Sequence, residues 1–276
     1  MAPVYPFPPR KILVPTDLGV ESESALKYAR YFHERFGSKV LVLHAHNIEL
    51  PPYFSSGQLK DMKRQLKKLG EAAAKYVRTK SRPALGHTPE ISVVESPPVE
   101  AILEASKGDE IDLVIMGMHG RHGLERIWLG SVTERVIRRS SLPILAVRHP
   151  PTGTSIEHLL CPISPSDTGR QALEYAAKFS KAIDARLTIL HVVEQDGEPL
   201  TCPLAAEDII KSCRVEEVNI HGNAARTIAE SIKSLKPDLI VMGAESKSTV
   251  LGDFFSSTTS SIMQLAVGPL LVVPKR

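Results

Sequence analysis

The chain has 276 residues, of which 42% are hydrophobic and 24% are charged, and its formal net charge is +3. This balance is typical of a globular protein with room for two domains, and it excludes an intrinsically disordered chain. The longest apolar runs are too short to cross a bilayer, and the proline-rich start MAPVYPFPPRK lacks the apolar core of a signal peptide.

Short apolar runs alternate with amphipathic stretches along the first half. The runs ILV, VLVLHA, ISVVE, LVIMG and ILAV predict strands at residues 12–14, 40–45, 91–95, 113–117 and 144–147. Between the first two runs, ESALKYARYFHERFG predicts an amphipathic helix that ends at Gly37. Alternating strands and helices predict a parallel sheet with helices on both faces.

The second half repeats the first. KILVPTD (Lys11–Asp17) corresponds to HLLCPIS (His158–Ser164), and KVLVLHAHN to RLTILHVVE, both at an offset of 147 residues. IDLVIMGMHG corresponds to PDLIVMGAES, and LPILAVRHP to GPLLVVPKR, at an offset of 126, so the second copy is 21 residues shorter between its second and fourth strands. The repeat predicts two tandem doubly wound domains, residues 1–149 and 155–276, separated by the linker RHPPTGTS.

Positive charge is concentrated in the first half. Residues 1–149 carry 22 Lys and Arg against 16 Asp and Glu, whereas residues 150–276 carry 12 against 15. A basic first half favours an anionic ligand there. A solvated helix face at KDMKRQLKK, residues 60–68, is an alternative source of much of this excess.

A glycine-rich stretch, GMHGRHGLERIWLGSVTERV, follows the fourth strand of the first half. Gly117 and Gly120 bracket a tight turn in which the backbone can approach a ligand closely. Gly130 precedes a helix that opens with Ser131, Val132 and Thr133, and such a helix start is an anion site. The basic loop between these glycines suits a polyphosphate, although neither a P-loop nor GxGxxG occurs. A glycine-rich turn with an ordinary serine N-cap is the alternative.

The pattern G-x2-G-x9-G-[ST] after a strand ending in MG resembles the nucleotide-binding pattern of the universal stress protein family. Gly117, Gly120, Gly130 and Ser131 match it, as do VPTD at the end of the first strand and LHA at the end of the second. The resemblance covers nearly the whole chain as two tandem family domains. It implies Rossmann-like domains, similar to adenine nucleotide alpha hydrolases, that form a pseudo-dimer within one chain.

The resemblance also implies an ATP site in the first domain. Its residues fall into three groups along the nucleotide. The adenine and ribose would lie beside Pro15, Thr16, Asp17 and the backbone of Ala45, where the family usually carries a bulkier aliphatic residue. The ribose and phosphate path would be lined by Gly117, His119 and Gly120. The phosphates would be held by Gly130, Ser131, Val132 and Thr133, with Mg²⁺ bridging phosphates and water.

Other roles for these residues stay open. Asp17 is also a candidate helix cap. A transition-metal site is a further alternative, with the candidate ligands His44, His46, His119 and His122. Neither paired carboxylates nor a Ser–His–Asp signature is evident, so an ATP-binding regulatory protein of the stress response is favoured over an ATP hydrolase, an adenylating enzyme or a scaffold with a structural ligand.

The second domain differs at the matching positions. Ser164, Ser246 and Ser256 stand opposite Asp17, Gly120 and Gly130, and the loop KSTVLGDFF is almost neutral. We therefore expect one ATP per chain. The fifth strands, Ile144–Val147 and Leu270–Val273, are predicted sheet edges, and the family resemblance implies that they pair the two domains. We also expect a homo-oligomer without nucleic-acid or membrane partners. Three cysteines without a CxxC motif favour the cytoplasm.

Overall fold

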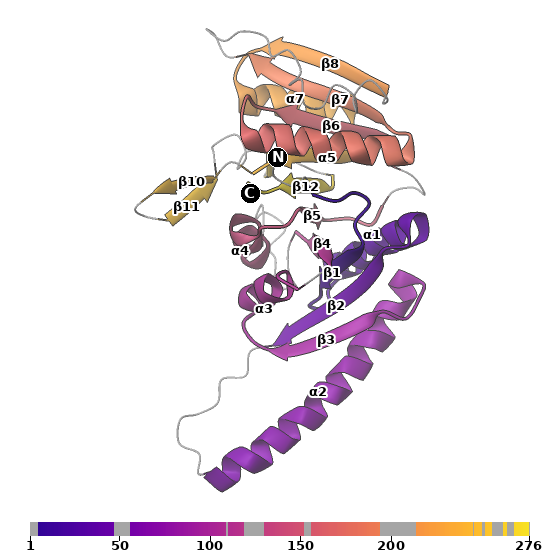
Figure 1. Ribbon diagram of the computed structural model, residues 1–276, viewed down its shortest axis with the longest axis vertical. Helices are drawn as coiled ribbons and strands as arrows, with labels where there is room; N and C mark the ends of the chain where they lie inside the picture. The colour runs from indigo at the N-terminus through magenta and orange to yellow at the C-terminus, as the bar shows by residue number, and fades with distance from the viewer. Residues whose placement is uncertain are drawn as a thin grey trace.

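A single ten-stranded sheet runs through both halves of the chain (Figure 1). The structure is a computed structural model that describes residues 5–46, 56–108, 110–118, 130–151, 156–193, 214–244, 246–249, 252–255, 262–263 and 268–275. The strand order is β3-β2-β1-β4-β5-β12-β9-β6-β7-β8. Each half thus has the same internal order, and the two halves meet at their fifth strands.

The five strands predicted for the first half are confirmed. They are β1 (Lys11–Pro15), β2 (Lys39–His46), β3 (Glu90–Glu95), β4 (Ile111–Gly117) and β5 (Ile144–Val147). All neighbours among them pair in parallel. The chain moves from β1 outward to β2 and β3 and then returns to β4 on the other side of β1, which makes the first half doubly wound.

The second half repeats this winding. Its parallel strands are β6 (His158–Ile163), β7 (Arg186–Val193), β8 (Arg214–His221), β9 (Leu239–Gly243) and β12 (Leu270–Val273). Between β9 and β12, the stretch expected to be a loop instead contains an antiparallel hairpin of β10 (Ser246–Thr249) and β11 (Gly252–Phe255).

The fifth strands join the halves, as predicted. β5 and β12 pair antiparallel, with Leu145 opposite Leu271. Both strands are buried along their whole length. Neither half therefore leaves this strand as an exposed apolar edge, and the intrachain pseudo-dimer is confirmed.

Helices cover both faces of the sheet. On one face lie α1 (Val20–Phe36), α2 (Ser56–Leu85) and α5 (Asp167–Ile183); on the other lie α3 (Pro98–Ala105), α4 (Ser131–Arg139) and α7 (Ala224–Leu235). Successive strand residues alternate between the two cores, so Ile12 and Val14 join one and Leu13 the other. Gly37 ends α1 at φ 72°, where its N–H donates to the carbonyl of His33.

Aromatic rings from both halves pack together where α1 meets α5. Phe32 and Phe179, which are 147 residues apart and so occupy matching positions of the repeat, have ring centroids 5.5 Å apart. Phe7 of the N-terminal segment packs against both rings, with its centroid 4.5 Å from that of Phe179. The Tyr5 hydroxyl donates to the carbonyls of Ser141 and Pro274. The N-terminal segment therefore ties the two halves together.

Two buried tyrosines at matching positions reach across this joint. Burial raises the pKa of Tyr28 to about 12, with a further contribution from the charge of Asp238 in the second half. Burial also raises the pKa of Tyr175, with a further contribution from the charge of Asp112 in the first half. The tyrosine of each half is thus influenced by the charge of the matching aspartate in the other half, as in a two-fold symmetric dimer.

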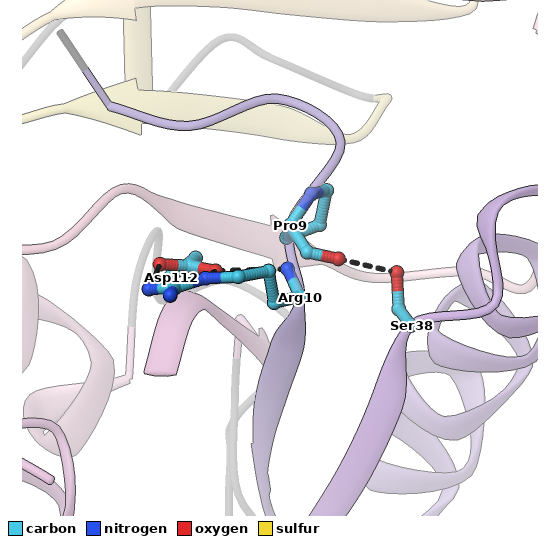
Figure 2. A network of polar contacts seen from close by, with 4 residues as sticks. All are labelled: Pro9, Arg10, Ser38 and Asp112. Atoms are coloured by element: carbon cyan, nitrogen blue, oxygen red, sulfur yellow. Dashed lines mark hydrogen bonds and ion pairs between the residues drawn. The ribbon is translucent and has the colours of Figure 1, made fainter. Parts of the chain in front are cut away.

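An ion pair fixes the amino end of β1 (Figure 2). The Arg10 guanidinium donates to both carboxylate oxygens of buried Asp112, at 2.9 and 3.0 Å, and this contact raises the pKa of Arg10. The backbone N–H of Arg10 donates to the same carboxylate at 2.8 Å, and Ser38 Oγ donates to the carbonyl of Pro9 at 2.7 Å. These contacts set the register of the strands whose opposite ends form the candidate site.

Candidate nucleotide-binding site

The carboxyl ends of β2, β1 and β4 lie side by side at one edge of the sheet. These strands are parallel neighbours, with Pro15 opposite Leu43 and Leu13 opposite Val114. The edge therefore brings together Asp17 after β1, Ala45 at the end of β2 and Gly117 at the end of β4. The winding direction reverses between β1 and β4, which is where doubly wound sheets bind their ligands.

Asp17 organises the turn from β1 into α1. Its Oδ1 accepts hydrogen bonds from the N–H of Gly19 at 2.9 Å and from the hydroxyl of Ser22 at 2.5 Å. Ser22 Oγ in turn accepts from the N–H of Asp17 at 3.1 Å. Leu18 between them has φ 63°, a left-handed conformation that costs a residue with a Cβ roughly 1–2 kcal/mol. Asp17 is not the N-cap of α1, because Gly19 holds that position and no side chain caps the helix, but its Oδ1 holds the strained turn that precedes the helix.

The ends of β1 and β2 are linked through Thr16. Its N–H donates to the carbonyl of Leu43 at 2.8 Å, and its own carbonyl lies 2.8 Å from Nδ1 of His44. Because a carbonyl can only accept, Nδ1 of His44 carries the proton in this contact. The lone pair of the neutral ring is then on Nε2. His44 consequently has a fixed orientation beside Ala45.

The start of α4 is attached to the end of β4. The N–H of Gly130 donates to the carbonyl of Met118 at 2.6 Å, and Thr133 Oγ1 donates to the carbonyl of Gly117 at 2.8 Å. Gly130, and not Ser131, is the N-cap, and no side chain caps the helix. The amides of Ser131, Val132 and Thr133 have no acceptor within the helix. A first turn of this kind presents N–H groups and the positive end of the helix dipole.

The described start of α4 carries side chains of both charges. Glu134 lies in the first turn, where its carboxylate would oppose an anion. It forms an ion pair with Arg138, one turn later. Arg135 lies beside it and donates from Nε to the carbonyl of Ser131 at 3.1 Å. Among the described residues near this helix start, two arginines thus accompany one carboxylate.

Part of the predicted site lies outside the described residues. These positions are His119, Gly120 and the basic residues that follow, including Arg121, His122 and Arg126. The four-histidine metal hypothesis falls partly there too; His44 and His46, its two described members, have ring centroids 6.1 Å apart. Within the part of the chain that the structure describes, no group of three His, Cys, Asp or Glu side chains is placed to hold a metal ion.

Ser22 is a site residue that the sequence analysis missed. It lies five residues beyond Asp17 and belongs to no motif. A signal was present in the internal repeat, where the pair Asp17 and Ser22 becomes Ser164 and Gly169. Both partners of the hydrogen bond change together between the two copies.

The matching edge of the second half is crowded by α5. Ser166 Oγ accepts from the N–H of Gly169 at 3.1 Å and lies 2.9 Å from Ser164 Oγ. A Cβ at Gly169 would overlap the carbonyl oxygen of Ser164. A Cβ at Gly243 would lie 2.7 Å from the carbonyl carbon and oxygen of Thr168. The first turn of α5 therefore packs backbone to backbone against the ends of β6 and β9.

The histidine at the end of the second strand also has a different partner in the second half. His191 Nδ1 lies 3.2 Å from Oδ1 of Asn219 on β8, on the side away from β6. In the first half, Val93 of β3 occupies the place opposite His44 and has no polar side-chain atom. The replacement of Val93 by Asn219 at matching positions thus gives the histidine of the second half a polar neighbour on the next strand.

The family model described as the universal stress protein family matches residues 9–148, 155–209 and 201–274. The chain belongs to the universal stress protein family. A universal stress protein of Methanocaldococcus jannaschii is 33% identical over 144 residues, which are 51% of this chain and 83% of that protein. A second one from the same organism is 32% identical over 153 residues, which are 50% of this chain and 94% of that protein.

A solved structure has the same architecture over the full length. The crystal structure of a universal stress protein from Archaeoglobus fulgidus covers 98% of this chain and 100% of that chain, with a TM-score of 0.76. At 24% identity, this likeness establishes the fold alone. The tandem arrangement of two universal stress domains in one sheet is therefore shared with a known structure.

Proposed function

We propose that the first half binds ATP at the edge formed by β1, β2 and β4, and that the protein acts as a nucleotide-dependent regulator in a stress response. One observation carries this proposal. The Asp17 turn and the uncapped first turn of α4, far apart in sequence, belong to the ends of the neighbouring strands β1 and β4. Together they offer a carboxylate for a sugar hydroxyl and amides for phosphate.

Each part of the nucleotide has a matching group. The adenine lies by the backbone of Ala45, whose small side chain leaves space beside His44. The ribose hydroxyls donate to Asp17, which Ser22 and Gly19 hold in place. The phosphates accept from the amides of Ser131, Val132 and Thr133. Thr133 contributes its amide, because its hydroxyl already donates to Gly117.

We also propose that Mg²⁺ accompanies ATP. The described residues offer no cluster of three metal-ligating side chains. Mg²⁺ suits such a place because it retains several waters and is commonly bound through phosphates. Removal of Mg²⁺ with a chelator should weaken ATP binding and leave the melting temperature of the nucleotide-free protein unchanged.

A regulatory role is favoured over catalysis because the site is connected to the other half. Strand β11 of the second half lies against α4, the helix whose start would hold the phosphates (Figure 1). Nucleotide binding at that helix would therefore act on a hairpin that the second half contributes.

No transmembrane candidate occurs among the helices described, since none combines enough length with enough apolar character.

Replacement of Gly130 by valine tests the phosphate assignment. The backbone at Gly130 has φ −62° and ψ 142°, which valine adopts without strain, so the helix start should form. The added side chain would occupy the space that phosphate must approach, and the Kd for a fluorescent ATP analogue should rise at least about tenfold, or about 1.4 kcal/mol.

A matched control is Gly268→Val in the second half, where the nearest atom to an added Cβ is 3.9 Å away. This variant should bind the analogue like the unmodified protein. An unchanged affinity in Gly130→Val, with the fold intact by circular dichroism, would refute the phosphate assignment. Mass spectrometry of any small molecule released from the freshly purified protein would identify the natural ligand independently.

A further inference from the structure

The N-terminal part of helix α2 extends away from the body of the protein (Figure 1). The helix spans 30 residues, and its C-terminal part packs against α1 and β3. The buried positions of that part are Val77, Ser81, Ala84 and Leu85. Two large apolar side chains on the same helix are left exposed, Leu69 at 61% and Tyr76 at 52%.

The exposed side chains belong to a heptad pattern in the sequence of α2. Apolar residues recur at alternating steps of three and four, at Leu59, Met62, Leu66, Leu69, Ala73 and Tyr76. Such a stripe, with two apolar positions in seven, is the narrow seam of a coiled coil rather than the wide face of a globular or membrane-surface helix. Val77 and Ser81 lie on a neighbouring stripe that α1 and β3 already cover.

Charge on α2 avoids the flanks of this seam. The helix carries nine Lys and Arg against two Asp and Glu. The flanking heptad positions, however, are filled by Gln58, Gln65, Ala72 and Thr79 on one side, and by Lys63, Gly70 and Val77 on the other. With one basic residue among seven flanking positions, the charges of a second identical helix would not meet across the seam.

The seam is also symmetric about its own centre. When two copies of the helix run antiparallel around the bond between Lys67 and Lys68, Leu66 faces Leu69 of the other copy. In the same alignment Met62 faces Ala73, a large residue against a small one, and Leu59 faces Tyr76. The first apolar position of each heptad (Leu59, Leu66 or Ala73) then packs against the second apolar position (Met62, Leu69 or Tyr76) of the other copy. An antiparallel two-fold interface requires this reciprocal pairing.

We propose that this seam is a self-association surface, at which α2 pairs antiparallel with α2 of a second copy of the chain. The exposure of Leu69 and Tyr76, the heptad spacing and its internal symmetry all support a partner of identical sequence. Since β5 and β12 pair within one chain, the fifth-strand edges cannot join two chains. The proposed contact uses residues of α2, none of which belongs to the candidate nucleotide site.

Light scattering on the full chain after size exclusion tests the proposal, with Leu69→Glu as the disrupting variant. The unmodified protein should show twice the monomer mass at high concentration, and Leu69→Glu should show the monomer mass. Lys75→Gln is the matched control, because it also lowers the net charge by one but lies at an exposed position off the seam. It should remain a dimer. Leu69 is largely exposed, so the variant should fold normally, and unchanged ATP-analogue binding would separate this test from that of the nucleotide site.

Salt distinguishes self-association from an anionic partner. Higher ionic strength screens the repulsion between two basic helices, so the dimer should strengthen between 50 and 500 mM salt. A monomeric unmodified protein, or a dimer that survives in Leu69→Glu, would overturn the proposal. So would a monomer that cosediments with phosphatidylserine vesicles at low salt and is released at high salt, because that result assigns the helix to a membrane surface.

Discussion

The two halves of the protein share a strand framework but differ at the edge where a ligand would bind. In the first half, Asp17 and Ser22 form a hydrogen-bonded pair that holds the turn into α1. In the second half the matching residues are Ser164 and Gly169, and Ser166 gives α5 a side-chain N-cap that α1 lacks at the matching Gly19. The carboxylate and the hydroxyl that form this hydrogen bond in the first half are thus both absent from the second half.

The turns themselves cannot have the same backbone. Leu18 has φ 63°, whereas the matching position holds Pro165, whose ring fixes φ near −65°. The second-half turn instead closes with a hydrogen bond from the N–H of Ser166 to the carbonyl of Ser164. This tighter turn accompanies the close packing of α5 on Gly243. The two copies thus retain the same strand order, while their turns after the first strand differ.

The largest expected effect is on stability, at the crowded edge. Gly169→Ala places a Cβ against the carbonyl of Ser164, and Gly243→Ala places one against the backbone of Thr168. Since backbone must shift in both cases, each should lower the free energy of unfolding by about 2–3 kcal/mol. Urea denaturation measures this, with Gly268→Ala as a control expected within about 0.5 kcal/mol of the unmodified protein. If neither variant changed the free energy of unfolding, the close packing of α5 against the ends of β6 and β9 would be contradicted.

A second prediction concerns a variant in which two residues of the first half are replaced by the matching residues of the second half. The double variant Asp17→Ser/Ser22→Gly removes the proposed ribose acceptor and the hydroxyl that orients it, so ATP affinity should fall at least about tenfold. Asp17→Ala alone should have a similar effect on affinity and should cost about 1 kcal/mol of stability, because the hydrogen bonds from Gly19 and Ser22 to Oδ1 are lost. Isothermal titration and urea denaturation measure the two quantities, and Ser164→Ala should change neither. Full ATP affinity in the double variant would remove Asp17 from the site.

The smallest effect concerns pH and a buried histidine of the second half. Burial and the nearby charge of Arg186 lower the pKa of His158, so the folded protein favours the neutral ring. The unfolded chain takes up a proton as the pH falls through about 6.5. This contribution to stability is present above that pH and is lost below it. His158→Gln should therefore flatten the fall in melting temperature between pH 7.5 and 5.5 by about 1–2 °C.

A control for that measurement replaces the exposed His149 by glutamine. Its melting temperature should follow the pH dependence of the unmodified protein. An equal slope in His158→Gln would show that this histidine is not a source of the acid sensitivity.

Much of the fold could be predicted from the sequence because buried parallel strands are continuous apolar runs. ILV, LVIMG and ILAV each became a strand, and the internal repeat fixed the order of both halves. The same topology also predicted that Asp17 and Gly117 lie at the same edge of the sheet. The hairpin of β10 and β11 did not, because KSTVLGDFF has the polar and glycine content of a loop.

The fine geometry of the site could not be predicted for a different reason. The bond between Asp17 and Ser22 depends on a turn in which a leucine takes a left-handed conformation, and no sequence pattern indicates that. The contact of His44 Nδ1 with the carbonyl of Thr16 likewise depends on the register of β1 and β2. Side-chain contacts of this kind arise only once the strands are placed.

The number of ATP molecules bound per chain tests the central claim most directly. Isothermal titration of the intact protein with ATP and Mg²⁺ should give a stoichiometry of one, because the second half has Ser164 in place of the Asp17 carboxylate and Ser246 and Ser256 in place of two glycines of the pattern. In the double variant Asp17→Ser/Ser22→Gly, the second half should not bind ATP in place of the first half. A stoichiometry of two, with similar affinities, would contradict the account by showing that both edges accept the nucleotide.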